Sequence, residues 1–525
     1  MRIEYDTPTY PQLGHIYLGD YYEELPYDEF INKNQKLPEG KKIFDIRDFG
    51  ARPEENLLNT EAFLAAAKAC EEAGGGVILV AGGSYCMGTV YIPSHTILFI
   101  AADSEIKASR NADLLIDAHP EGKIDYGTES SEGTFVRVKD ACDVTITGGG
   151  RINGSGEWYV YEPRELPMRE PFPMTKIPRR DQASEINTLS DTIRYYYRQR
   201  IRYAEDKYQE GKATLKRPSY MVWIQDSTDI KVENIILHDA MTWTLNADCC
   251  DRVTIENVVI DDNRHVANTD GFDITGCTDV TIHHCFVSCA DDGICLKNPI
   301  YTNKTMKNVK ISDCTVLSVM NAFKIGTGTA QDIEDVVVKN CHFCMPDLYP
   351  GSVSGISIES CDGSHVKNVR IESIKMENVA CPIYILLNMR NESKEHYTDE
   401  VGENRYWGGS ISDVTIRNVH AEGAELPCII TGFETKKKDG TPVRRAVSDI
   451  LVENFYMKYH DNEEIIEIPE EIPEFLTDYP ESNAHGDVDA CGIWSRHTDR
   501  LVLKNIHIEP RSCNTREWIK GYDQK

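Results

Sequence analysis

A short phrase recurs along the chain and restricts the folds open to it. The phrase is an Asp or Asn, then alternating aliphatic residues, then a polar residue (often Asn), then an apolar residue or Cys. Its clearest copies are DIKVENI (229–235), RVTIENV (252–258), DVTIHHC (279–285), NVKISDC (308–314), DVVVKNC (335–341) and NVRIESI (368–374). Their central aliphatic residues are spaced by 23, 27, 29, 27 and 33 residues. The period-two alternation predicts a strand in each phrase, and a repeat of this length predicts a solenoid.

The positions after each central residue predict how the coils stack. The residue two positions on is often Asn, which tolerates the left-handed backbone conformation, so a stacked turn is expected there. The position after it is apolar or Cys, and Cys285, Cys314 and Cys341 fall in that column. We interpret these thiols as small hydrophobes in the core rather than as a metal or redox cluster. Coils of two or three short strands predict an all-β fold, a right-handed parallel β-helix, in one long domain.

Three other segments frame the repeat. Residues 1–42 are interpreted as an N-terminal extension, and 43–525 as a single β-helix domain. A helix is expected from Asn59-Thr60, with Asn59 as a candidate cap, through EAFLAAAKACEEA to three glycines, and it would cap the N-terminal end of the core. Residues 160–217 interrupt the repeat and are expected to form an inserted helical arm. This arm either shapes a substrate cleft or an oligomer contact, or packs on the side as a solvated helix.

Composition limits the partners and the compartment. The 525 residues include 56 Lys and Arg against 85 Asp and Glu, a net charge of −29, which argues against nucleic acid and anionic membranes as partners. The N-terminus shows no apolar leader, and no apolar run long enough to span a membrane follows. The 17 cysteines form no regular CxxC pairs and predict free thiols in a reducing compartment. We therefore expect a soluble cytoplasmic protein without cofactor or metal. The sequence leaves its oligomeric state open.

Two segments, NTDGFDITG (268–276) and CADDGICLKN (289–298), carry a concentration of carboxylates. When strands are aligned by their inward apolar residues, Asp270 stacks over Asp292 and then over Asn321, with Asp291 beside Asp292. Adjacent rungs of a sheet lie about 4.7–4.9 Å apart. Like charges at that spacing disfavour joint ionisation, so one carboxyl is expected to keep its proton beside an ionised neighbour. This is the arrangement of a general acid beside a general base.

The same alignment places further polar residues on the outward columns around the carboxylates. One column holds Asp273, Cys295, Lys324 and Ser357, and the column two positions further holds Thr275, Lys297, Gly326 and Glu359. The residues expected to contact a substrate are Asn268, Asp273, Lys297, Asn321, Lys324, Ser357 and Glu359.

NTDGFDI followed by ADDGICLK resembles the signature of glycoside hydrolase family 28, the polygalacturonase family. FDIRDFGA with NTEAFLAAAKACEEAGGGVILV resembles the N-terminal cap of that family, and GGGRINGSGEWYV resembles its next conserved phrase. The resemblance implies inverting hydrolysis of a glycosidic bond in an oligosaccharide. Asp291 would then be the general acid, and Asp270 and Asp292 would hold and deprotonate the attacking water. Inverting enzymes keep their carboxyl groups roughly 6.5–9.5 Å apart.

Two departures from the family pattern bear on the substrate. The Gly-His-Gly of the family is replaced by Met320-Asn321-Ala322, and its Arg-Ile-Lys, which binds the galacturonate carboxylate, by Ser357-Ile358-Glu359. An anionic sugar would lose charge-assisted hydrogen bonds at this position. Lys324 either restores part of the lost charge or is a surface lysine that pairs with Glu359. We therefore expect an exo-acting hydrolase of short pectin-derived or neutral oligosaccharides.

Two alternatives remain open from the sequence. A β-elimination polysaccharide lyase shares the fold class, and Lys297 or Lys324 beside Asp273 would supply its base. A non-catalytic carbohydrate-binding or structural β-helix is the other, in which Asp291→Asn would change no measurable property.

Overall fold

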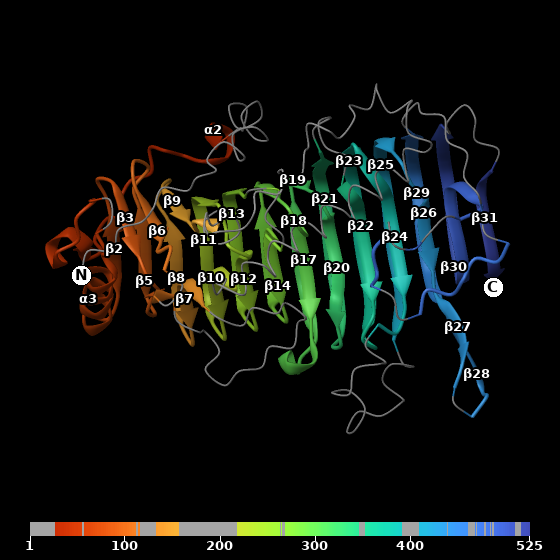
Figure 1. The fold of residues 1–525 in the computed structure, drawn as a ribbon, viewed down its shortest axis with the longest axis horizontal. Helices are drawn as coiled ribbons and strands as arrows, with labels where there is room; N and C mark the ends of the chain where they lie inside the picture. Colours follow the sequence, from red (N-terminus) through yellow and green to blue (C-terminus); the bar gives the residue numbers. More distant parts are fainter. Residues whose placement is uncertain are drawn as a thin grey trace, which may run out of the picture. The chain divides into compact units, whose positions relative to one another are not determined.

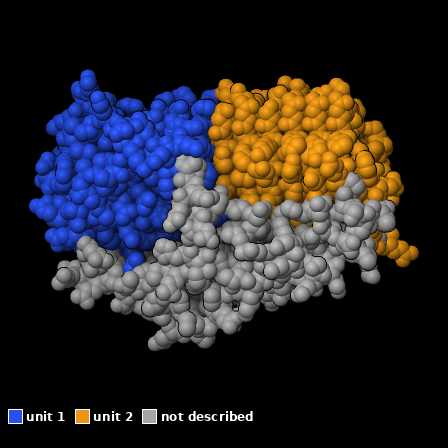
Figure 2. Space-filling model, turned by 90° about the horizontal axis from the view of Figure 1, so that it is seen from above, with its two compact units in different colours: residues 1–173, 200–291 blue, residues 174–199, 292–525 orange. Residues whose placement is uncertain are grey.

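The computed structural model describes residues 27–54, 57–111, 114–115, 133–156, 218–262, 264, 268–345, 352–390, 409–437, 439–459, 468, 470–476, 479–482, 485, 488–509 and 516–525. The chain divides into two compact units, residues 1–173 with 200–291 (unit 1) and residues 174–199 with 292–525 (unit 2) (Figure 2). The single domain predicted for 43–525 stays a prediction. The helical arm predicted for 160–217 lies outside the described residues.

Unit 1 is a parallel β-helix whose strands stack in three rows (Figure 1). The row through the repeat phrases pairs Val232 with Ile255 and Ile255 with Ile282, as the spacing of the phrases predicts. The strands of unit 1, in all three rows, are β1 Ile43–Asp45, β2 Gly76–Val80, β3 Ser84–Met87, β4 Val90–Tyr91, β5 Thr96–Ile100, β6 Glu105–Ala108, β7 Thr134–Lys139, β8 Cys142–Thr147, β9 Arg151–Asn153, β10 Tyr220–Gln225, β11 Thr228–His238, β12 Trp243–Asp248, β13 Asp251–Asp261, β14 Phe272–Thr275, β15 Thr278–His283 and β16 Phe286–Cys289.

Unit 2 continues the same repeat with longer strands. Ile311 pairs with Val338 and Val338 with Ile371, again in the predicted register. A short antiparallel hairpin, β27–β28, projects from this unit (Figure 1). The strands are β17 Ile294–Asn298, β18 Met306–Ser312, β19 Thr315–Ser318, β20 Asn321–Thr329, β21 Ile333–Cys344, β22 Ser352–Ser360, β23 His365–Glu377, β24 Val379–Leu387, β25 Ser410–Ala424, β26 Cys428–Thr431, β27 Phe433–Lys436, β28 Pro442–Arg445, β29 Val447–Tyr459, β30 Ala490–Glu509 and β31 Glu517–Gln524, with a short 3-10 turn at Ile300–Thr302 (η5). The predicted fold class, a right-handed parallel β-helix, is confirmed.

The asparagine turns form as predicted. All six asparagines of the predicted column have positive φ, between 49° and 55°: Asn234, Asn257, Asn340, Asn418, Asn454 and Asn505. In unit 2 the amide of Asn454 donates to Asn418 Oδ1, and the amide of Asn505 donates to Asn454 Oδ1, both at 2.9 Å. The first residue of most phrases also adopts the left-handed conformation, which the sequence reasoning missed. Most copies of the phrase therefore carry a left-handed residue before and after their alternating aliphatic residues.

The cysteine column belongs to the core, as predicted. Cys285, Cys314 and Cys341 are buried free thiols, and each lies within hydrogen-bond distance of the carbonyl oxygen two residues earlier. The residues at the same repeat position in the preceding and following coils, Val258 and Ile374, have buried aliphatic side chains. These thiols therefore act as small apolar residues that also satisfy a turn carbonyl.

A helix covers the N-terminal end of unit 1. The helix α3, Thr60–Glu72, packs its buried face, which includes Phe63, Ala66 and Cys70, against β1, β2 and the 3-10 turn η1 (Ile46–Phe49) (Figure 1). Asn59 is its N-terminal boundary residue, as predicted, but its side chain accepts from Arg52 N and donates to Leu57 O instead of capping the helix.

The N-terminal extension is described from Tyr27 and begins with the short helix α2, Tyr27–Phe30. It is fastened to unit 1 where Asn32 N donates to Asn234 Oδ1. None of the helices in the described ranges is long and apolar enough to cross a membrane.

Candidate active site

Unit 1 brings Asp270 and Asp291 together. Asp270 precedes β14 and Asp291 follows β16, and the backbone N–H of Asp291 donates to Thr269 O at 3.3 Å. The backbone N–H of Ala290 donates to the Thr269 hydroxyl at 3.1 Å. Asp270 is buried, whereas Asp291 is partly exposed. Two carboxyl groups of the predicted catalytic set are thus held on adjoining loops of one unit, one within the protein and one facing solvent.

Asn268 and Asp273, both predicted to contact the substrate, contact the protein in unit 1. Asn268 has a left-handed backbone, with φ of 61°, and its amide lies 3.5 Å from Asp291 Oδ2. It therefore orients the predicted general acid. Asp273 was expected on an outward column, but it is fully buried and pairs in register with Asn246 of β12.

Asp292 directly follows Asp291 in the chain and is the first residue of the 292–525 segment of unit 2. The Asn321 amide donates to Asp292 Oδ1 at 2.7 Å, so the predicted stacking of these two residues is confirmed. The glycine after the acidic pair is required by packing: a Cβ on Gly293 would lie 2.3 Å from Val316 Cγ1 and 2.8 Å from Ala322 O. The Asp-Asp-Gly motif thus turns tightly into β17, and this turn fixes the direction of the Asp292 carboxylate.

Lys324 is the centre of a buried ion cluster in unit 2. Its side chain is 1% exposed, so the expectation of a surface lysine is wrong. Three carboxyl groups surround its Nζ: Glu481 at 2.8 Å, Asp292 at 3.4 Å and Glu359 at 3.8 Å. Burial alone would lower the pKa of Lys324, but the three acidic neighbours hold it well above its usual value. We call these four residues the Lys324 cluster.

The pKa values of two carboxyl groups in this cluster are raised by burial, that of Glu481 and that of Glu359. Glu359 is the fully buried one of the two. Burial raises its pKa to about 8; Lys324 opposes this shift, whereas Glu481 adds to it. The Ser357 hydroxyl donates to Glu359 Oε1 at 2.6 Å. Gly326, where φ is 140°, leaves room for the other oxygen, because a Cβ there would lie 2.6 Å from Glu359 Oε2. Ser357 and Glu359, predicted to touch the substrate, are both fully buried.

The predicted outward columns of unit 2 are correct in register and wrong in exposure. Cys295 pairs with Lys324 and Lys324 with Ser357, as aligned from the sequence, but all three are buried. Lys297 departs from the alignment because the register shifts between Leu296 and Asn298, which displaces it from Gly326.

The rim of the Lys324 cluster is formed by Tyr479 and Arg390. Tyr479 is 56% exposed, and its ring centroid lies 5.8 Å from Lys324 Nζ and 5.8 Å from Arg390 Cζ. The Arg390 guanidinium bonds to the Thr327 hydroxyl at 2.7 Å and pairs with Asp362 at 3.3 Å. An exposed aromatic ring therefore lies over a floor of buried, mutually compensating charges.

The sequence analysis missed Glu481, Tyr479 and Arg390. All three lie outside the repeat phrases and in no recognised motif. One signal was available for Glu481, because a lysine inside a strand row needs a counter-charge when it is buried. That requirement predicts an acidic partner without saying where in the chain it lies.

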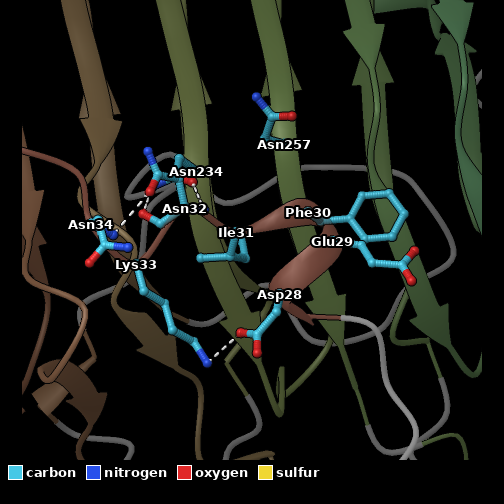
Figure 3. Close-up of a pocket in the computed structure, with 9 residues that line it drawn as sticks. All are labelled: Asp28, Glu29, Phe30, Ile31, Asn32, Lys33, Asn34, Asn234 and Asn257. Atoms are coloured by element: carbon cyan, nitrogen blue, oxygen red, sulfur yellow. Dashed lines mark hydrogen bonds and ion pairs between the residues drawn. The ribbon is translucent and has the colours of Figure 1, made fainter.

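Unit 1 also has a surface pocket that is lined by other residues than the predicted site residues. It has a volume of about 560 Å³ and lies between the extension and two turn asparagines, Asn234 and Asn257 (Figure 3). Its lysine, Lys33, is engaged by Asp28 at 2.6 Å. None of the predicted site residues lines this pocket.

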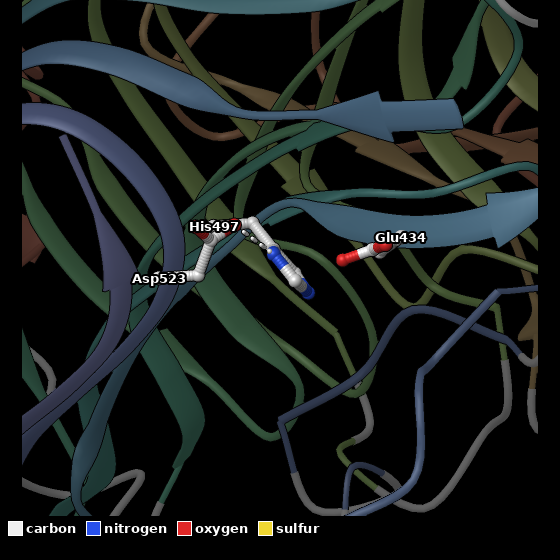
Figure 4. A group of neighbouring side chains, drawn as sticks. All are labelled: Glu434, His497 and Asp523. Carbon is white, nitrogen blue, oxygen red and sulfur yellow. Dashed lines mark hydrogen bonds and ion pairs between the residues drawn. The ribbon is translucent and has the colours of Figure 1, made fainter. Parts of the chain in front are cut away.

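A second group of titratable residues occurs near the end of unit 2. Glu434, His497 and Asp523 approach one another closely enough to suggest a metal site (Figure 4). Both ring nitrogens of His497 are already engaged, Nδ1 by Asp523 at 2.8 Å and Nε2 by Glu474 at 2.9 Å. Burial lowers the pKa of His497, but its hydrogen bonds to these two carboxylates leave it raised overall. We interpret the group as a structural ion pair network.

Comparison with known proteins places this geometry in a context. The model of glycosyl hydrolases family 28 matches residues 200–453. A grapevine (Vitis vinifera) protein named "Probable polygalacturonase" is 23% identical over 407 residues, which cover 74% of this chain and 70% of that protein. Both findings include the two acidic motifs and most of the repeat.

Two solved structures share the fold. An exopolygalacturonase from Thermotoga maritima has a TM-score of 0.61 at 16% identity, with 92% of this chain and 95% of that chain covered. A family 28 exopolygalacturonase from Yersinia enterocolitica has a TM-score of 0.62 at 15% identity, with 92% and 78% covered. At such identities the likeness concerns the fold.

Proposed function

We propose that this chain, which matches the model of glycosyl hydrolases family 28 over residues 200–453, is a polygalacturonase-like glycoside hydrolase that removes sugar units from the ends of short pectin-derived or related oligosaccharides by inverting hydrolysis. Asp291 protonates the leaving oxygen, and Asp270 and Asp292 hold and deprotonate the attacking water. The observation that carries the proposal is the close approach of Asp270 and Asp291 in unit 1, whose nearest carboxylate oxygens lie within 4.8 Å of each other, with Asp292 next in the chain. This is closer than the roughly 6.5–9.5 Å between the carboxyl groups of inverting enzymes, so inversion is proposed from the family resemblance alone. Exo-action is carried over from the departures at Asn321, Ser357 and Glu359 from the family pattern.

The environments of the three carboxyl groups support these roles. Asp291 is the partly exposed member, and a general acid must reach the leaving oxygen of a bound sugar. Asp292 receives hydrogen bonds or charge contacts from Asn321 and Lys324, so its oxygens are oriented as acceptors. An acceptor of fixed direction suits a residue that positions a water molecule.

A β-elimination with Lys324 as the base is disfavoured by the state of this lysine. A lyase base must be able to lose its proton near neutral pH. The pKa of Lys324 is held well above its usual value by three acidic neighbours, and its side chain is 1% exposed. Lys324 is therefore unsuited to abstract a proton from a sugar ring.

The proposal is tested by hydrolysis of a panel of pectic and neutral α-linked oligosaccharides by the wild type and by Asp270→Asn, Asp291→Asn and Asp292→Asn. General acid–base groups contribute about 10²–10⁴-fold, so each variant should lose activity on that scale. Asp279→Asn is the matched control, because Asp279 is an exposed residue of unit 1 with φ of 56°, a conformation that Asn tolerates equally. If the wild type cleaves a substrate and all three variants keep its rate, the assignment is wrong.

We also propose a cytoplasmic location, supported by the cysteines. Every cysteine in the described ranges is a free thiol, and free thiols persist in reducing compartments. Cell fractionation of the native host, with antibodies against this chain, tests the location; recovery outside the cytoplasm contradicts it.

A further inference from the structure

The Lys324 cluster contains more acidic than basic groups. Three carboxyl groups face one ammonium group, and every member is less than 10% exposed. The nearby Arg390 does not change this balance, because it is paired with Asp362.

Glu481 makes the shortest contact with the lysine, although it is 157 residues away in sequence. Its carboxylate accepts from Lys324 Nζ at 2.8 Å and from the Asn321 amide at 3.1 Å. Ser482, the next residue, is also fixed: its hydroxyl is 2.9 Å from the Ser354 hydroxyl and donates to Val353 O at 3.1 Å. The Glu481 carboxylate is therefore fixed by Lys324 and Asn321, and the chain next to it is fixed by the hydrogen bonds of Ser482.

The carboxylate of a uronate sugar could make the same contacts with a lysine and an amide that the Glu481 carboxylate makes here. In this chain the Glu481 carboxylate accepts the hydrogen bond from Lys324, so this lysine is already paired and does not bind a substrate carboxylate. We propose that Glu481 is a specificity-determining residue, which occupies Lys324 and makes this position of unit 2 select an uncharged sugar unit over the corresponding uronate. The inference rests on the proposed hydrolase function and names the substrate class at its site.

Tyr479 supplies the surface on which such a sugar would rest. Its exposed ring lies on the same short segment as Glu481 and over the Lys324 ammonium. The apolar face of a neutral pyranose packs on an aromatic ring without placing a charge near the buried carboxylates. A uronate in the same place would lie near three carboxyl groups, while the two cations described beside them, Lys324 and Arg390, are already paired with acidic residues.

The experiment compares matched substrate pairs that differ only at C6, such as an α-galactoside and the corresponding α-galacturonide, or an α-glucoside and its α-glucuronide. We expect the wild type to show a higher kcat/KM for the neutral member. Glu481→Gln keeps the size of the side chain and removes the carboxylate nearest to Lys324 Nζ, which leaves Asp292 at 3.4 Å and Glu359 at 3.8 Å. Because a charge-assisted hydrogen bond is strong, this variant should shift the neutral-to-uronide ratio toward the uronide by about tenfold or more.

Glu377→Gln is the matched control, because it removes the same charge from a lysine-bound glutamate on the surface of unit 2. Unfolding midpoints of all variants establish that they are folded, and Glu481→Asp serves as a second variant that restores the charge. A wild type that prefers the uronide overturns the inference, as does a folded Glu481→Gln protein with an unchanged ratio.

A binding experiment tests this inference separately from the proposed function. Dissociation constants for D-galactose and D-galacturonate are measured by calorimetry on the same proteins. Tighter binding of the neutral sugar, weakened selectively by Glu481→Gln, supports the inference even if no substrate is cleaved. Equal binding of both sugars, or binding of neither, contradicts it.

Discussion

At the scale of single residues, the chemistry of this chain depends on how buried acids are partnered. Asp270 and Asp291 share adjoining loops of unit 1, whereas Asp292 is drawn toward an amide and an ammonium in unit 2. A further carboxyl group, that of Glu359, has its pKa raised to about 8. The sequence could not predict this, because the shift arises from burial and from Glu481, a residue outside every motif.

The pKa of Glu359 gives a prediction about stability. It is about 8 in the folded protein against an ordinary value of 4.5, so between these values the folded state holds one more proton than the unfolded state. The stability from this group is fully present below about 4.5 and is lost as pH rises through about 8. The wild-type free energy of unfolding should therefore fall by up to about 1.4 kcal/mol per pH unit in this window because of this group.

Glu359→Gln isolates the effect, since the amide cannot titrate. Urea unfolding at pH 5.5, 6.5 and 7.5 should give a flatter pH dependence for the variant than for the wild type. Identical slopes for the two proteins would show that Glu359 does not carry the proton.

At the scale of elements, the repeat phrase predicted the strands and turns well because it encodes local physics. Period-two alternation buries one face of each strand, and asparagine tolerates the left-handed turn, so register and turns follow from the residues themselves. Exposure of the outward columns could not be predicted in this way. Lys324 and Ser357 lie in the predicted register, but Glu481 arrives from a distant segment and contacts Lys324 in the buried cluster.

The asparagine ladder supplies an element-scale prediction. Asn454 donates to Asn418 and accepts from Asn505, and its φ is 53°. Asn454→Gly keeps the left-handed backbone conformation and loses the side-chain hydrogen bonds. Asn454→Val loses these hydrogen bonds and also disfavours the left-handed conformation. The left-handed conformation costs a residue with a Cβ about 1–2 kcal/mol, so Val should be less stable than Gly by about that amount in urea unfolding.

Lys458→Val is the control for this comparison, since Lys458 is a partly exposed position of the same strand, β29, without positive φ. It should be nearly neutral. An Asn454→Val protein as stable as Asn454→Gly would mean that the left-handed turn is not needed at this position.

At the scale of the whole molecule, the sequence predicts a hydrolase from two motifs, and the relatives agree with that class. What the motifs do not determine is the sugar. The departures at Asn321, Ser357 and Glu359 indicated a change of substrate, and the structure adds Glu481 as the partner that uses the charge of Lys324. Substrate choice thus depends on contacts between distant segments, whereas reaction type depends on a local motif.

The most direct measurement of the central claim is time-resolved ¹H NMR of the wild-type protein with an α-linked oligosaccharide that it cleaves, with Asp291→Asn beside it. Inverting hydrolysis predicts that the β-anomer of the released sugar appears first, followed by slow mutarotation, and that the variant forms product about 10²–10⁴-fold more slowly. First appearance of the α-anomer, an unsaturated product, or an undiminished rate in Asp291→Asn would contradict the account.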